Sequence, residues 1–193
     1  EKLVASYAGS ITVRSYPRFN AQVSTLDIKN GISEYRKLKG YNPDIVIVDS
    51  MDLLTDANRR SWGADHERAK RIAVANDLKD LAADEKVWMV VTYQSTIEDR
   101  EWLNDERNVL TEYNCSEAKG LARPCTHLVS LNQSSAERKE NVMRLHVAKS
   151  RFFKKGDTIR IATDYDNEVF YDGQRTLNLN LSLIHISEPT RPY

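Results

Sequence analysis

The sequence predicts a mixed α/β fold with a mostly parallel sheet flanked by helices and an antiparallel hairpin at one edge. In its first half, apolar strand patterns alternate with helical patterns. Parallel strands need such a long, usually helical crossover, whereas antiparallel strands need only a short turn. In the second half, two alternating strand patterns follow each other with one turn between them. The two halves therefore favour parallel pairing early in the chain and antiparallel pairing late.

The first half begins with a short expected strand at residues 11–15. Apolar residues then recur at helical spacing over residues 25–38, and Gly40 provides a stop signal. An apolar strand, Ile45–Val48, follows and ends at Asp49. We expect this strand to be fully buried, with the carboxylate at its tip.

A polar loop at residues 55–65 carries Arg59 and Arg60 and leads into a second helix at 66–84. The next apolar strand, at 87–93, ends just before Gln94. Ligands of open α/β sheets bind at the carboxyl ends of the strands. An Asp there holds Mg²⁺ through its waters, and a Gln orients a water or senses a phosphate.

A charged stretch at residues 96–114 shows no clear periodicity, and long segments of this kind are often functional or mobile. A short strand at 128–131 follows. Two further strands, at 142–149 and 158–163, form the predicted hairpin.

Composition fits one domain of ordinary size, since the chain has 193 residues. Its 28 Lys and Arg balance 28 Asp and Glu, so no overall field attracts nucleic acid and any DNA contact must be local. Cys115 and Cys125, with His127 and His146, match no zinc spacing. Two cysteines and no apolar run of membrane length predict a reducing cytoplasm and no membrane partner.

Four segments together resemble the C-terminal ATPase domain of DnaB-type replicative helicases and their phage relatives, and RecA-fold ATPases more broadly. These segments are 44–54, 90–95, 128–131 and 147–151. The resemblance covers residues 8–172 and implies a RecA-like fold, here a partial domain. The phosphate-cradling loop, G-x-x-x-x-G-K-[ST], and the catalytic Glu of the family would lie upstream of this sequence.

The resemblance also implies roles for individual residues. Asp49, with Ser50, would act on Mg²⁺·ATP, and Gln94 would couple the γ-phosphate to a DNA-binding loop. Lys149 and Arg151 match a Lys-x-Arg pair that reaches the ATP of the neighbouring subunit. Strand alternation places these two cations on one face. The plain alternatives are a turn-capping Asp, a surface amide and two solvated cations.

The stretch at 96–114 matches the family's DNA-contacting loop, which would make Arg100 and Arg107 its DNA contacts. Acidic residues outnumber these two, however, and phosphate contact favours Lys and Arg. The family also often has an Asp where this chain has Thr126 and His127. The charge of this loop therefore disfavours direct contact with the DNA backbone.

The whole protein is expected to be a ring-forming homohexameric helicase that uses ATP and Mg²⁺ to move on single-stranded DNA. A primase or a helicase loader would be its partner, in a bacterial or phage-infected cytoplasm. Two alternatives stay open. One is a RecA-like ATPase that does not unwind DNA, in recombination or regulation, and the other is a non-catalytic interaction module.

The last residues form a separate expectation. The string 181–191 resembles the translation of a transposase sequencing adapter, so we assign 1–180 to the partial RecA-like core and 181–193 to an artefactual tail. An incomplete core would leave the apolar strands uncovered at Val46 and Val91.

Overall fold

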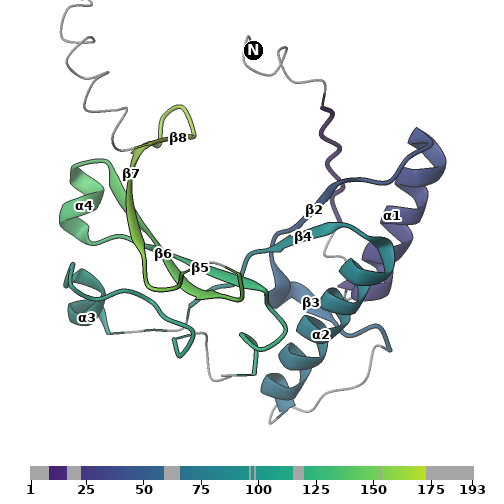
Figure 1. The fold of residues 1–193 in the computed structure, drawn as a ribbon, viewed down its shortest axis with the longest axis horizontal. Coiled ribbons are helices and arrows are strands. Elements are labelled where there is room, and N and C mark those ends of the chain that lie inside the picture. The colour runs from purple at the N-terminus through teal and green to yellow at the C-terminus, as the bar shows by residue number, and fades with distance from the viewer. Residues whose placement is uncertain are drawn as a thin grey trace, which may run out of the picture.

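The computed structural model of the chain describes residues 9–16, 23–58, 66–95, 97, 99–114, 120–152 and 154–172. Figure 1 shows the elements, which follow in this order: β1 (Val23–Ser24), α1 (Thr25–Lys39), β2 (Ile45–Val48), η2 (Met51–Leu53), β3 (Leu54–Thr55), α2 (Glu67–Glu85), β4 (Trp88–Val91), α3 (Arg100–Asn104), β5 (His127–Asn132), α4 (Ser135–Lys139), β6 (Val142–Ser150), β7 (Thr158–Asp164) and β8 (Val169–Asp172). Arg59, Arg60, Cys115 and the tail at 181–193 lie outside the described residues.

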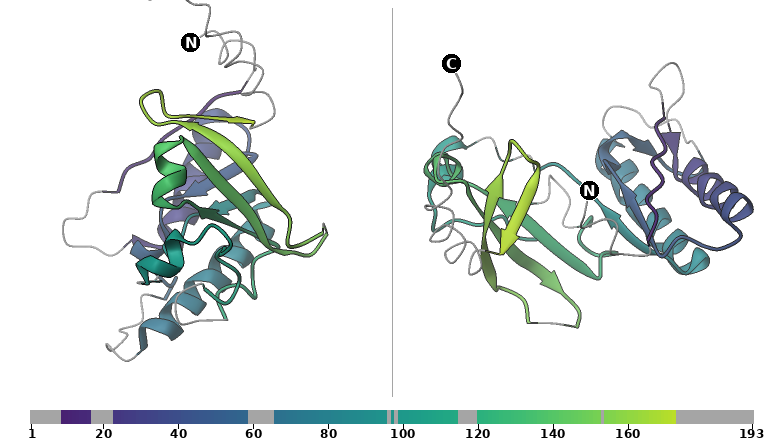
Figure 2. Two further views of the ribbon diagram at one scale, coloured as in Figure 1. Left: turned by 90° about the vertical axis from the view of Figure 1, so that its left-hand side faces the viewer. Right: turned by 90° about the horizontal axis from the view of Figure 1, so that it is seen from above.

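The elements gather into two regions that lie side by side (Figure 2). One region holds α1, α2 and two parallel strand pairs, β1 with β3 and β2 with β4. The other holds the antiparallel sheet β5–β6–β7–β8 with α3 and α4 beside it. The predicted parallel pairing of the two apolar strands is thus confirmed. The antiparallel part is larger than the single expected hairpin.

Helix α1 shows how local sequence sets these elements. Ser24 and Asp27 form a capping box in which the Ser24 N–H donates to Asp27 Oδ2 over 2.8 Å. The helix ends at Gly40, whose φ of 81° is one that glycine adopts without a Cβ clash. The predicted helix and its stop are confirmed.

One hydrophobic core joins α1 and α2 to one face of β2 and β4. Burial of these side chains provides the main favourable free energy of this region. Its buried members are Ile28, Ile32, Val48, Met51, Leu54, Val74, Ala75, Leu78, Leu81 and Leu121.

Among the described residues, no helix combines the length and apolar character needed to cross a bilayer.

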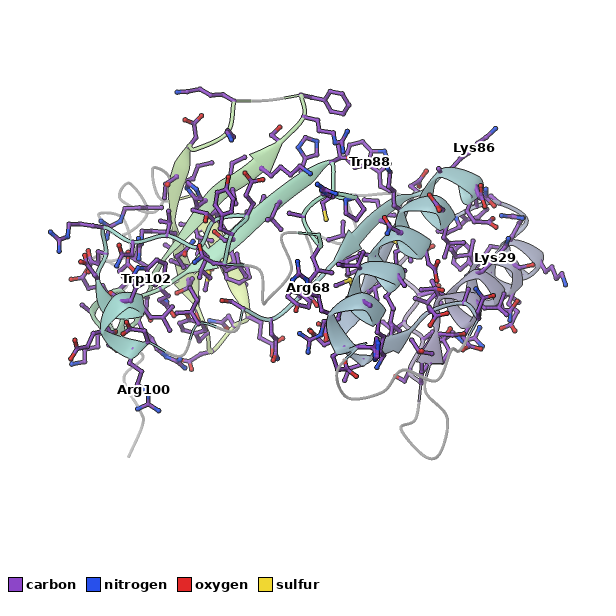
Figure 3. All side chains as sticks on the ribbon, turned by 90° about the horizontal axis from the view of Figure 1, so that it is seen from below. Lys29, Arg68, Lys86, Trp88, Arg100 and Trp102 are labelled. Atoms are coloured by element: carbon purple, nitrogen blue, oxygen red, sulfur yellow. The ribbon has the colours of Figure 1, made fainter. Side chains whose placement is uncertain are left out.

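The prediction that β2 and β4 are fully buried is wrong for one of their faces. Side chains alternate along a strand, so Val46 and Val91 pack against the core while their neighbours point the other way. On that other face Ile47 is 70% exposed and Trp88, labelled in Figure 3, is 78% exposed. The apolar face without cover is therefore not the one carrying Val46 and Val91, as the sequence suggested.

The predicted strand at residues 11–15 is also wrong. This stretch has no regular structure, and Ile11 and Val13 are exposed. It lies along α1 instead, where Arg14 forms an ion pair with Glu34 and the Tyr16 hydroxyl donates to the carbonyl of Asp27 over 3.2 Å. These side-chain contacts hold the segment without any strand partner among the described residues.

A buried ion pair anchors the antiparallel region. Arg144 Nε of β6 lies 2.7 Å from Glu137 Oε1 of α4, as a close charge contact rather than an aligned hydrogen bond, and the side chains are 7% and 0% exposed. The Arg144 Nη1 group also donates to the carbonyls of Glu106 and Asn108. One guanidinium therefore connects α4, β6 and the segment after α3.

Replacing Arg144 with Ala should lower the free energy of unfolding by about 3–5 kcal/mol, because Glu137 would stay buried without its cation. Urea unfolding of the chain measures this loss. The matched control is Arg160→Ala on β7, which is exposed, stands opposite Arg144 in the sheet and should change stability by less than about 0.5 kcal/mol. Equal effects of the two substitutions would contradict the buried role of the pair.

Candidate functional site

Two polar residues lie at the carboxyl edge of the parallel pair β2–β4. The strands pair in register from Ile45 with Trp88 to Val48 with Val91, so the chain leaves both strands at the same level. Asp49 follows immediately, and its Oδ1 accepts a hydrogen bond from the Thr92 hydroxyl over 2.5 Å. The carboxylate is exposed, and its peptide bond to Ser50 is cis.

Gln94 lies on the same edge, two residues beyond Thr92. Its N–H donates to Asp52 Oδ2 over 3.3 Å, and the Met51 N–H donates to the carbonyl of Thr92 over 3.1 Å. These bonds tie the turn after β2 to the turn after β4. Asp49 and Gln94 are therefore brought to one edge by the backbone, as the sequence predicted.

The chemistry of this edge suits a hard cation. An exposed carboxylate with a neighbouring half-buried Ser50 hydroxyl offers the oxygen ligands that Mg²⁺ prefers. Among the described residues no three His, Cys, Asp or Glu side chains converge as a metal cage. Mg²⁺ keeps several of its waters and is usually held by one or two carboxylates, so it needs no such cage.

Lys149 and Arg151 form a second cluster at the end of β6. Lys149 Nζ donates to the carbonyls of Ala122 and Arg123, and Arg151 Nη2 donates to the same Arg123 carbonyl over 3.1 Å. A shared acceptor requires both side chains to lie on one side of the strand. The two cations point the same way, as alternation predicted.

The two clusters are not joined within the chain. β2 and β4 lie in one region and β6 in the other (Figure 1), and no hydrogen bond or ion pair between described residues connects Asp49 or Gln94 to Lys149 or Arg151. Within the described part of one chain, Lys149 and Arg151 therefore make no contact with the Asp49 and Gln94 edge.

The stretch after β4 is more structured than the sequence indicated. It holds α3, and its next turns are fixed to β5 by two bonds, Leu110 N–H to Asn132 Oδ1 over 2.7 Å and Ser130 hydroxyl to the Leu110 carbonyl over 2.6 Å. Arg100 is the exposed first residue of α3 (Figure 3). Arg107 is 89% exposed on its side chain and paired with Asp105 over 2.6 Å.

Sequence reasoning missed two contributors to these clusters. Thr92 could have been predicted from the sequence, because a hydroxyl at the end of one parallel strand lies beside the residue that follows the neighbouring strand. The segment 122–127 accepts the hydrogen bonds of Lys149 and Arg151. Nothing in the sequence indicated this role except that the segment precedes a predicted strand. It forms turns that depend on tertiary contacts.

The Arg107 guanidinium holds the pKa of the Asp105 carboxyl at about 2, below its ordinary 3.8, mainly through the side-chain hydrogen bond. A depressed pKa stabilises the fold above about pH 4, and this effect is lost as the pH falls toward 2. An NMR titration of the Asp105 carboxyl should show the low midpoint. Arg107→Ala should raise it toward 3.8, whereas Arg100→Ala should leave it unchanged.

No protein-family model matches the chain, and no curated protein sequence matches it. Many solved structures are similar to it, among them two helicase or ATPase-domain structures. A DnaB-like replicative helicase, described with its interactions with primase, has a TM-score of 0.60 and 22% identity over 77% of this chain and 36% of its own. The ATPase domain of G40P has a TM-score of 0.61 and 21% identity over 78% of this chain and 51% of its own. The chain spans only part of each neighbour, and within that part it has the RecA-like fold of the ATPase domain of DnaB-type replicative helicases.

Proposed function

We propose that the whole protein is an ATP-dependent DNA helicase of the DnaB type. It couples hydrolysis of Mg²⁺·ATP between subunits to movement along single-stranded DNA. The observation that carries this proposal is the placement of Asp49 and Gln94 at the same carboxyl edge of β2–β4. The helicase ATPase fold supports it, because that edge is the ligand-binding edge of open α/β sheets.

Asp49 and Ser50 would hold Mg²⁺, with Asp49 acting through a bound water. The Thr92 hydroxyl fixes the orientation of the Asp49 carboxylate by its 2.5 Å bond. Gln94 would orient the attacking water and sense the γ-phosphate. The Mg²⁺ ion supplies charge stabilisation to the phosphate oxygens. The glycine-rich loop that cradles phosphates would come from another part of the protein.

Lys149 and Arg151 would act on the nucleotide of the neighbouring subunit. Their separation from Asp49 and Gln94 within the chain supports this assignment. A cation at the γ-phosphate stabilises the charge that develops in the transition state. The active form would thus be a homo-oligomer, a hexameric ring, in which each interface completes one site.

The inner surface of the ring would bind single-stranded DNA. Arg100 is the better candidate contact, because Arg107 is held by Asp105. One structural neighbour is described with a primase, so a primase or a helicase loader is the proposed partner. The setting would be the cytoplasm of a bacterium or of a phage-infected host.

In the full-length protein, Arg151→Ala should lower ATP turnover by about 10³–10⁵-fold with nucleotide binding largely intact. A phosphate-release assay and nucleotide titration measure the two quantities. The control is Arg160→Ala, an exposed cation on the neighbouring strand that should leave both unchanged. Equal loss of binding and turnover in Arg151→Ala would contradict a role across the interface.

Asp49→Asn should lower turnover by about a hundredfold or more, because the Mg²⁺ contribution to catalysis is several kcal/mol. Nucleotide binding without Mg²⁺ should be unaffected. The matched control is Asp44→Asn, which removes an exposed carboxylate at the opposite end of the same strand.

A strand-displacement assay on the wild-type protein separates a helicase from an ATPase that does not unwind DNA.

A further inference from the structure

The end of β6 that carries the two cations is held from both of its faces. On one face, the carbonyls of Ala122 and Arg123 accept from Lys149 and Arg151. Ser150 lies between them in sequence and points to the opposite face by strand alternation. The backbone of the same end is fixed too, since the Arg151 N–H donates to the carbonyl of Thr126 over 3.1 Å.

His127 is the side chain that meets Ser150 on that opposite face. The two residues stand directly across from each other in the β5–β6 register, and His127 Nδ1 lies 3.2 Å from Ser150 Oγ. The same Ser150 Oγ accepts from the N–H of Phe152 over 3.3 Å. The hydroxyl therefore links the imidazole to the turn that follows the cations.

The imidazole also contacts the ring of Phe152. Their ring centroids are 5.9 Å apart with the planes tilted by 57°, although Phe152 is largely exposed. His127 thus touches the residues on either side of Arg151, one by a polar contact and one by a ring contact. None of these contacts reaches the guanidinium itself.

We propose that His127 is a positioning residue for Lys149 and Arg151, acting through Ser150 and Phe152. This inference rests on the proposed function, in which the two cations stabilise a phosphate on a neighbouring subunit. Long Lys and Arg side chains lose much rotamer freedom when they are fixed. When the face of the strand end that carries Ser150 is held by His127, the Lys149 and Arg151 side chains already point in one direction. They therefore lose less conformational entropy when the subunit interface aligns them on the phosphate.

The rate of a catalysed reaction depends strongly on the position of the groups that stabilise its transition state. Displacements of about 1 Å at a reacting centre cost about a hundredfold in rate, even when they arise from residues outside the chemistry. His127 lies on β5, the neighbour of β6 in the sheet, and its contact with Ser150 is one of those that fix the last residue of β6. It needs no contact with nucleotide to affect turnover.

The test uses the full-length protein and separates the two contacts of His127. His127→Phe keeps a ring beside Phe152 but removes the nitrogen, whereas His127→Asn keeps a polar atom near the Nδ1 position. Losing one hydrogen bond at this site should lower kcat for ATP by about tenfold, with KM unchanged. His127→Asn should recover most of kcat, and Ser150→Ala should lower kcat at least as much as His127→Phe, because it also removes the acceptor of the Phe152 N–H.

A double-mutant cycle then tests the route through Ser150. His127→Phe with Ser150→Ala should lose no more kcat than Ser150→Ala alone, because the serine substitution already removes the contact with His127. The matched control is His146→Phe, which removes a similar histidine–hydroxyl pair, His146 Nδ1 to Thr158 Oγ1 at 2.9 Å, between β6 and β7. It should lower the melting temperature and leave kcat unchanged.

Three results would overturn the inference. They are an unchanged kcat in His127→Phe, additive losses in the double mutant, and an equal loss of kcat in His146→Phe. Arg151→Ala distinguishes this failure from failure of the proposed function. If Arg151→Ala abolishes turnover while His127→Phe does not lower it, only the positioning role is wrong. If Arg151→Ala keeps full turnover, the cation pair has no catalytic role and both proposals are wrong.

Discussion

The parallel register of β2 with β4 is the constraint on which the rest of the structure depends. It places Asp49 next to Thr92 and brings Gln94 to the same edge. The same register turns Val48 and its partners toward α1 and α2, so one pairing sets both the core and the candidate site. A shift by one residue would exchange the two faces and move the carboxylate away from its partner.

The antiparallel region depends on a different kind of contact. Its anchor is the buried Arg144 guanidinium of β6. This group contacts Glu137 of α4 and donates to the backbone carbonyls of Glu106 and Asn108. A buried ion pair is weak evidence of net stability, but breaking one is costly. The consequence is geometric, because β6 cannot slide along its neighbours without losing the pair. The strand β6, which leads to Lys149 and Arg151, is thereby fixed near its start as well as at its end.

The sequence was sufficient where local signals and tertiary packing agreed. The first helix has a cap, a regular apolar spacing and a stop at Gly40, and it was predicted within a residue or two. Residues 11–15 show the opposite case, since an alternating pattern forms a strand only beside another strand. β8 was missed because its turn lacks glycine, and Asn167 makes that turn by donating to Asp164 Oδ1 over 3.1 Å. At the candidate site, the residues at strand ends could be predicted from the sequence. Contacts between distant segments, such as that of His127 with Ser150, could not.

The uncovered face of β2–β4 has a thermodynamic consequence. The heat capacity of unfolding comes mainly from apolar surface that is newly exposed to water. Ile45, Ile47, Trp88 and Val90 are already largely hydrated in the folded chain, so they add little to that quantity. The chain alone should therefore have a flatter stability curve than its length suggests. A segment that covers this face would instead raise the heat capacity change of unfolding, because that apolar surface would become exposed only when the chain unfolds.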